Sequence, residues 1–450
     1  MTAAGQPVRV PFPVVDEVAR HCMQEEEPET VHIEIHLPGP LDAPRLRKAF
    51  TEALHRHPRV LMREAPGPWY RRRYEWELTA EPDVEVIRFA PPGPNALRDA
   101  RTRALTGAPP LSTSPPIRLE VVEVAGNEAT GLAGGGGPTR PPAVGATGRR
   151  PHGTVLFLTI NHTALDGPAC LRVLATAAEL YGGRDNAPTA PPVRPPDAPQ
   201  EPVDAPSNWS PPARVAPGTP GTIPGNGLLV TELALPHRPK GSPYTVNDQL
   251  MVTTALTIAH WNREHGARPR PLRITMPVDD RPRDADMPIG NGTRLVEVTF
   301  APEELAGAPD GMPALLGRTA TRTRALKALP RPQLGHGAAL LTTPVTPVAW
   351  RAALTRGLRR AAAPWTSTTL LSNIGRVPYA LDFGEEAGRA LAVWFSAPAR
   401  MPRGLTVTTA STAGRLHLAL RWSCALLGPD DGAHLRDLFE HHLHATEVTP

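Results

Sequence analysis

The sequence predicts a mixed α/β protein built from two lobes, and three features lead to that prediction. In each half of the chain, strand-like runs alternate with amphipathic helical runs. Residues 186–224, a segment dense in proline, separate the halves and have a composition that builds no core. The 450 residues are enough for two or three domains of ordinary size. We therefore expect an N-terminal lobe over residues 1–185, a linker over 186–224 and a C-terminal lobe over 225–450.

The first half begins with a strand at 30–39, where aliphatic residues alternate with two histidines and a glutamate. This alternation predicts a half-buried strand whose polar face meets solvent, which we favour over a metal site on that face. The next stretch is a helix capped by Asp42 and closed by Pro58. Further strands are expected at 68–79, 117–124 and 154–162, and a helix at 167–183. The 154–162 run is almost wholly apolar and should be central, and the Gly-rich residues 125–153 before it should form a long hairpin loop.

The second half repeats this alternation of strands and helices. Thr245 or Asn247 caps a long helix that stops at Gly266. Strand patterns are expected at 228–236, 271–282, 293–300, 368–378, 391–399, 404–412 and 415–423, and helical patterns near 313–328, 346–362 and 430–445.

Composition narrows the classes of function. The net charge is +4, the aromatic content is 5% and no block of five or six basic residues occurs, which argues against a nucleic-acid partner. Cys22, Cys170 and Cys424 are far apart, so they suit a reducing cytoplasm and form neither a disulfide framework nor a thiolate metal site. The sequence shows no signal-peptide pattern and no run of 18 apolar residues. We expect a cytoplasmic monomer with no membrane partner.

A polar cluster at the end of the expected central strand carries the chemistry. Asn161, His162 and Thr163 follow the apolar run, and Asp166 and Gly167 make the turn into the next helix. A rigid strand would hold the imidazole, whose ordinary pKa of about 6.5 suits a general base at neutral pH. Gly167 would tolerate unusual dihedral angles, and Asp166 would accept backbone N–H groups or an arginine. The alternative is that His162 and Asp166 only cap a strand-to-helix turn.

The stretch "NHTALDG" resembles the HHxxxDG signature of the condensation-domain superfamily, and weaker landmarks follow in the family's order. These are the early helix "LDAPRLRKAFTEALHRHPRV", the "TVNDQLMVTTALTIAHW" helix, "MPVDDRP" with "GNGT", and "LLSNIGRVP". The superfamily includes condensation domains of nonribosomal peptide synthetases, chloramphenicol acetyltransferase and polyketide-associated acyltransferases. The resemblance implies two chloramphenicol-acetyltransferase-like lobes in a V-shaped arrangement, with a tunnel between them.

The resemblance also implies roles for individual residues. His162 would be the catalytic base, and Asp166 would be structural and pair with Arg281 from the second lobe. Ser372 and Asn373 would approach the tunnel from that lobe and contact the substrate or the developing oxyanion. Asn161 stands where the signature has its first histidine, a residue that shapes the loop. No metal and no permanently bound cofactor are implied.

The resulting expectation is a free-standing acyltransferase. It would move an acyl group from a phosphopantetheine thioester, on an acyl or peptidyl carrier protein or coenzyme A, to a hydroxyl or amine of a small-molecule acceptor. The usage of Pro, Ala and Arg suggests a bacterium of high GC content, and together with the family resemblance this implies secondary metabolism, such as antibiotic biosynthesis. Two alternatives stay open: a catalytically silent docking module, which Asn161 favours, and a different reaction on a carrier-bound chain.

Overall fold

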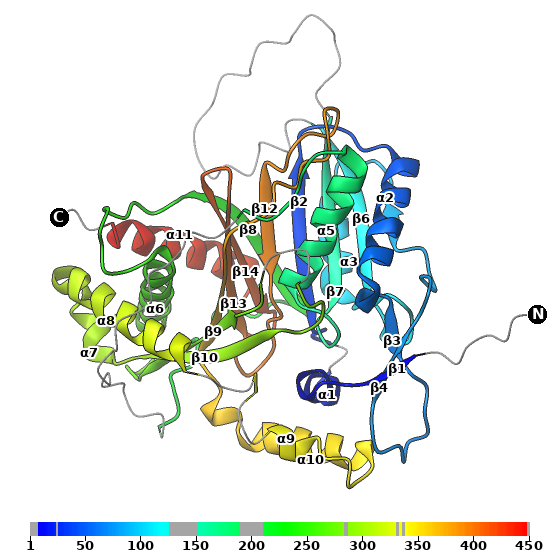
Figure 1. Cartoon of the computed structure of the whole chain (residues 1–450). Coiled ribbons are helices and arrows are strands. Elements are labelled where there is room, and N and C mark those ends of the chain that lie inside the picture. Colours follow the sequence, from blue (N-terminus) through cyan, green and yellow to red (C-terminus); the bar gives the residue numbers. More distant parts are fainter. Residues whose placement is uncertain are drawn as a thin grey trace, which may run out of the picture.

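The computed structural model describes residues 8–23, 26–125, 152–189, 210–282, 287–329, 333–334 and 338–447. Within these ranges the strands form three sheets, and Figure 1 shows the two larger ones standing next to each other, each with its own helices. Most of the expected hairpin loop at 125–153, and residues 190–209 of the expected linker, lie outside the described residues.

The first large sheet has the strand order β12-β2-β7-β6-β5. β7 lies in its middle, as the apolar run predicted, and pairs antiparallel with both neighbours. Asn161 at the end of β7 is opposite Thr30 at the start of β2. The strands are β2 (Thr30–Leu37), β5 (Ile87–Phe89), β6 (Ile117–Ala125), β7 (His152–Asn161) and β12 (Ala392–Ser396).

β12 comes from the second half of the chain but belongs to this first sheet. It pairs antiparallel with β2, with Ala392 opposite His36 and Ser396 opposite His32. The residues around β12 predicted a strand, and the strand is present. Its sheet could not be read from the sequence, because an apolar run fits either sheet equally well. This crossing strand ties the two lobes together.

The polar face of β2 does not meet solvent, so that prediction was wrong. His32, Glu34 and His36 are only 1%, 2% and 3% exposed. Helix α3 (Ala96–Thr106) covers this face, where His32 Nε2 lies 3.1 Å from the Ala104 carbonyl oxygen and Arg101 forms an ion pair with Glu34 at 2.6 Å. Polar residues at every second position fit a strand face that meets solvent, and they fit equally well a face covered by a helix whose arginine pairs with them. The alternation by itself therefore does not distinguish the two environments.

The opposite face of the first sheet packs against α2 (Ala43–Arg56) and α5 (Gly167–Gly182). Both helix starts follow the predicted caps: Asp42 Oδ1 accepts the Arg45 N–H at 2.8 Å, and Asp166 caps α5. A 3₁₀ turn, η1 (Pro58–Val60), follows α2.

A small third sheet is made of β1 (Arg9–Pro11), β3 (Met62–Glu64) and β4 (Glu75–Leu78), in the order β1-β4-β3. The strand predicted at 68–79 forms only over its last part. Before β4, Arg71 pairs with Glu64 and donates to the Ala65 carbonyl oxygen at 2.7 Å. These bonds hold the chain in a loop there.

The second large sheet has the order β10-β9-β11-β13-β14-β8. Its apolar core includes residues from α6, α8 and α11, which Figure 1 shows on one side of it. The strands are β8 (Asn226–Ala234), β9 (Leu272–Asp279), β10 (Thr293–Phe300), β11 (Thr369–Arg376), β13 (Leu405–Thr412) and β14 (Arg415–Ser423). The helices are α6 (Val246–Glu264), α7 (Pro302–Ala306), α8 (Ala308–Ala328) and α11 (Pro429–Ala445).

Three further helices lie across the opening between the lobes, at the lower edge of Figure 1. They are α1 (Val14–His21), α9 (Ala338–Leu341) and α10 (Val348–Ala361), and the 3₁₀ turn η2 (Ala363–Trp365) follows α10. Among the described helices, none is both long and apolar enough to span a bilayer.

Candidate functional site

The turn after β7 fixes the backbone and the ring of His162. The His162 N–H donates to the Glu29 carbonyl oxygen at 2.9 Å, and the Leu165 N–H donates to the Asn161 carbonyl oxygen at 3.3 Å. His162 Nδ1 lies 3.1 Å from the Leu165 carbonyl oxygen. Because a carbonyl oxygen only accepts, Nδ1 carries the proton in this bond. Nε2 is then the ring nitrogen whose lone pair is free to take a proton.

Asn161 is buried beneath this turn and does not line the cavity described below. Its Nδ2 donates to the Pro109 carbonyl oxygen at 2.9 Å, and its Oδ1 accepts the Thr163 N–H at 3.1 Å. Both ends of the amide are therefore engaged with backbone, one with Thr163 next to His162 and the other with Pro109 in the segment before β6. This geometry supports the expectation that the residue shapes the loop.

Replacing Asn161 with alanine is expected to lower the free energy of unfolding by about 1–3 kcal/mol, because two buried backbone groups lose their partners. Any activity that depends on His162 should fall less than it does when His162 itself is removed. Urea denaturation and a rate measured well below the melting temperature check both effects. Asn186→Ala is the matched control, since Asn186 is also a buried amide bonded to backbone groups. A large loss of rate with unchanged stability would mean that Asn161 takes part in the chemistry.

Asp166 joins the two lobes through both of its carboxylate oxygens. Oδ1 accepts the Ala169 N–H at 3.0 Å and so caps α5. Oδ2 accepts from Arg281 Nη2 at 2.7 Å and from the Gly292 N–H at 2.9 Å. The predicted Asp166–Arg281 pair is therefore present in the structure, and the helix-cap alternative is present with it.

Arg281 is itself held by several acceptors. Its Nε donates to Asp279 Oδ1 at 2.8 Å, and its Nη1 donates to the carbonyl oxygens of Pro288 and Gly290. Burial raises the pKa of Asp166, and the Arg281 charge and two backbone N–H groups oppose that rise. Burial by itself would lower the pKa of Arg281, but Asp279 and Asp166 outweigh it and raise that pKa. The pair is thus a buried charge cluster that depends on both partners.

Gly167 lies where little room is left for a side chain. Its φ is not among the positive values found in the described glycines, so the unusual dihedral expected from the sequence is absent. A Cβ at this position would lie 3.3 Å from the Phe395 ring on β12. The close approach of the crossing strand therefore explains the glycine.

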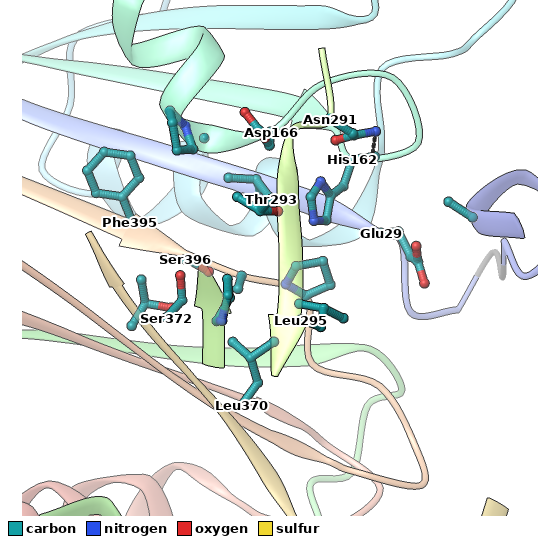
Figure 2. Close-up of a pocket in the computed structure, with 18 of the residues that line it drawn as sticks. Glu29, His162, Asp166, Asn291, Thr293, Leu295, Leu370, Ser372, Phe395 and Ser396 are labelled. Atoms are coloured by element: carbon teal, nitrogen blue, oxygen red, sulfur yellow. Dashed lines mark hydrogen bonds between the residues drawn. The ribbon is translucent and has the colours of Figure 1, made fainter. Parts of the chain in front are cut away.

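Asn291 and Asp16 form a second brace behind His162, and the sequence reasoning missed it. Asn291 Nδ2 lies 3.1 Å from the His162 carbonyl oxygen, 3.0 Å from that of Thr163 and 2.9 Å from Asp16 Oδ1. Figure 2 shows Asn291 above the imidazole. Trp76 Nε1 donates to Asp16 Oδ2 at 2.8 Å. The "GNGT" stretch gave a signal for Asn291, whereas nothing in the sequence pointed to Asp16.

Asp16 should make stability depend on pH, because burial raises its pKa from 3.8 to about 7 against hydrogen bonds from Asn291 and Trp76. The folded protein keeps this proton up to about pH 7, and the unfolded chain releases it near pH 4. The stability of the wild type relative to Asp16→Asn should therefore fall as pH rises from about 4 to about 7, by at most about 1.4 kcal/mol per pH unit, and level off above. Urea unfolding of both proteins over this range measures the difference. A constant difference would contradict the shift.

A cavity of about 440 Å³ lies between the lobes, and His162 lines it together with residues of both lobes. Leu370, Ser372 and Ile374 line it from β11, while Leu371 between them is fully buried in the second core. This alternation places the Ser372 side chain on the cavity face. Figure 2 shows His162 and Ser372 on different sides of the cavity.

The two residues predicted on β11 differ in their partners. Asn373 lines the cavity, but its Nδ2 donates to Asn247 Oδ1 at 3.2 Å and its Oδ1 accepts the Gly375 N–H at 2.9 Å, where β11 bulges. The Ser372 hydroxyl has no hydrogen-bond partner among the described residues. Ser396 on β12 also lines the cavity, and its buried hydroxyl forms no hydrogen bond with the described residues. Ser396 was missed because its strand could not be placed from the sequence.

The carboxylates of Asp166, Asp279 and Glu29 at this site are each paired with an arginine. Within the described ranges, no group of three His, Cys, Asp or Glu side chains is placed to hold a metal ion. What the site offers is one imidazole with a free Nε2, hydroxyl donors across a cavity, and an ion pair that fixes the loop. This arrangement suits proton transfer from a nucleophile.

The fold is that of two-lobed condensation domains and chloramphenicol acetyltransferase-like acyltransferases, as predicted. The trichothecene 15-O-acetyltransferase TRI3 of Fusarium sporotrichioides aligns with a TM-score of 0.62 at 11% identity, covering 100% of this chain and 97% of its own. The condensation domain of the Monacolin K polyketide synthase MokA aligns with a TM-score of 0.60 at 12% identity, over 98% of each chain. The starter condensation domain of rhizomide synthetase RzmA, in complex with C8-CoA, aligns with a TM-score of 0.59 at 12% identity, over 98% of this chain and 95% of its own.

Sequence comparison finds relatives that are more similar in sequence but have no described activity. Uncharacterized proteins from two strains of Mycobacterium tuberculosis are 25% identical over 401 residues, covering 83% of this chain and 84% of each relative. No family model matches the chain.

Proposed function

We propose that this protein is an acyltransferase that moves an acyl group from a pantetheine thioester to a hydroxyl or amine, with His162 as the general base. The observation that carries the proposal is the bond between His162 Nδ1 and the Leu165 carbonyl oxygen, which leaves Nε2 as the basic nitrogen beside an interlobe cavity. The fold, shared with acyltransferases and condensation domains, supports the same class of reaction.

The proposed step needs no covalent enzyme intermediate. Nε2 takes the proton from the acceptor as its oxygen or nitrogen attacks the thioester carbonyl. The carbonyl oxygen becomes an oxyanion and accepts a hydrogen bond from the Ser372 hydroxyl. When the tetrahedral intermediate collapses, the C–S bond breaks and the thiolate takes the proton from the imidazolium. An ester or amide and a free thiol result.

The donor is proposed to be a phosphopantetheine thioester on an acyl or peptidyl carrier protein or on coenzyme A. The apolar part of the cavity would suit the acyl chain, and it includes Val31, Leu171, Leu370, Ile374 and Phe395. The RzmA domain with the same fold was solved with C8-CoA, which supports a thioester donor here. A role in bacterial secondary metabolism remains part of the proposal.

Ser372→Ala is expected to lower kcat by about 10-fold or more and to leave KM for the thioester nearly unchanged, because the hydroxyl acts on charge that develops in the transition state. Steady-state kinetics with one donor and one acceptor would separate the two constants. Thr412→Ala, at a hydroxyl on β13 that does not line the cavity, serves as the control. If Ser372→Ala and the wild type have the same kcat, Ser372 does not stabilise the oxyanion.

The function is tested by incubating the protein with acyl carrier and acyl-CoA thioesters and a panel of amines and alcohols, and following products by mass spectrometry. Product formation that requires the protein and His162 supports the proposal. Binding of the loaded carrier without transfer to any acceptor would favour the docking-module alternative. A product other than an ester or amide would favour a different reaction on the carrier-bound chain.

A further inference from the structure

One part of the cavity wall is lined by three arginines that the proposed chemistry does not use. Arg359 comes from the last turn of α10, and Arg400 and Arg403 come from the segment that leads from β12 to β13. They come from two segments that are separate in the chain, so no sequence pattern links them.

Of the three, only Arg400 forms an ion pair with a carboxylate of the described residues. It forms an ion pair with Glu29 and donates to the Cys22 carbonyl oxygen at 2.7 Å. Arg403 donates to the hydroxyls of Ser367, at 2.9 Å from Nη2, and Thr275, at 3.4 Å. For Arg359, the described part of the chain supplies neither a hydrogen bond nor an ion pair.

The three cations act on one another. Burial lowers the pKa of Arg403 to about 10, with Arg400 and Arg359 adding to that effect and Glu297 opposing it. Burial also lowers the pKa of Arg400, where Glu29 opposes and Arg359 reinforces the shift. Glu297 lies 3.7 Å from the nearer Arg273 nitrogen, so its charge is shared. With a pKa of about 10, Arg403 still carries its charge at neutral pH. Among the described residues, the three guanidinium groups outnumber the one carboxylate that pairs with them, that of Glu29.

Partly buried cations that repel one another lower stability unless something binds them. A guanidinium group presents N–H donors in a planar fork that matches phosphate and carboxylate. Ser367 and Thr275 hold the Arg403 fork in a fixed orientation, and the Glu29 carboxylate holds that of Arg400. The wall is thus preorganised for a negatively charged oxygen group.

We propose that Arg359, Arg400 and Arg403 form a subsite for an oxyanion, a phosphate or carboxylate, carried by one of the two substrates. This inference rests on the proposed function, since it assigns a substrate feature to the same cavity. The oxyanion has two sources: the phosphate of the donor's phosphopantetheine arm, or an acidic group on the acceptor. Glu29 links the subsite to the base, because its carbonyl oxygen accepts the His162 N–H and its carboxylate pairs with Arg400.

Binding measurements test the subsite without requiring activity. The full chain is titrated calorimetrically with two matched pairs of probes. The donor pair is 4′-phosphopantetheine and pantetheine, and the acceptor pair is 3-hydroxybenzoate and 3-hydroxybenzamide. In the wild type, the charged probe of one pair is expected to bind about tenfold more tightly than the neutral probe of the same pair. The pair that shows the preference identifies the source of the oxyanion.

Arg359→Gln and Arg403→Gln should each remove most of that preference. Arg415→Gln is the control, because Arg415 forms an exposed ion pair with Glu232 between β14 and β8 and should leave the preference intact. Arg359→Gln should also keep or raise the melting temperature at low salt, since it removes repulsion and breaks no described bond. Equal binding of charged and neutral probes in both pairs would overturn the subsite, and so would a preference that survives both substitutions.

The outcomes separate this inference from the proposed function. A wild type that prefers the charged probe but transfers no acyl group would refute acyl transfer and leave the subsite standing. The subsite alone would be refuted by a wild type that transfers acyl groups but binds the charged and neutral probes equally, with Arg359→Gln and Arg403→Gln leaving this unchanged. A lower melting temperature in Arg359→Gln with unchanged anion preference would assign this arginine a structural role.

Discussion

His162→Ala is expected to lower kcat for acyl transfer by about 10²- to 10⁴-fold, the usual contribution of a positioned general base. The free energy of unfolding should change by less than about 1 kcal/mol. The substitution removes one bond to the Leu165 carbonyl oxygen, whereas the backbone bond to Glu29 and the contact from Asn291 to the His162 carbonyl remain. The imidazole borders a cavity, so its loss leaves little unfilled core.

The measurement is a steady-state rate by mass spectrometry together with a urea unfolding curve for the same protein sample. His55→Ala is a matched control, because His55 is an exposed histidine on α2 that contacts Glu81. It should keep the wild-type rate. A His162→Ala protein that transfers acyl groups as fast as the wild type would show that His162 is not the base.

Arg281→Ala is expected to lower the free energy of unfolding by about 3–5 kcal/mol and to reduce the rate as well. The substitution leaves the carboxylates of Asp166 and Asp279 buried beside each other without their shared cation. It also removes the donor for the Pro288 and Gly290 carbonyl oxygens. Asp166 Oδ2 attaches the turn that contains His162 to Arg281 of the second lobe. Without this bond, the base should lose its fixed position.

Two variants sharpen this prediction. Arg281→Lys keeps the charge but not the planar fork, so it should recover only part of the stability. In the double variant Arg281→Ala with Asp166→Asn, one unpaired charge is gone, and the combined loss should be smaller than the sum of the single losses. Arg415→Ala, at an exposed pair, should cost less than about 1 kcal/mol. A stable and fully active Arg281→Ala protein would exclude the proposed role of the pair.

Local patterns were sufficient for most elements of this fold. The caps at Asp42 and Asp166, the apolar run of β7 and the stop after α5 were read correctly, because each depends on residues that are neighbours in the chain. The order of the motifs predicted the two-lobed fold and the Asp166–Arg281 pair. The strand at 68–79 was overextended, since Arg71 makes bonds to the preceding β3 region that a strand pattern does not encode.

The sequence by itself determined most of the longer strands and helices, and it placed His162 at the end of a central strand. Only the tertiary structure decided which sheet receives β12, that α3 covers the polar face of β2, and that Asp16 and Asn291 brace the His162 turn. It alone brought Arg359, Arg400 and Arg403 to one wall. The physical reason is range: periodicity and caps act over a few residues, whereas burial, ion pairing and repulsion depend on groups that meet only when the chain has folded.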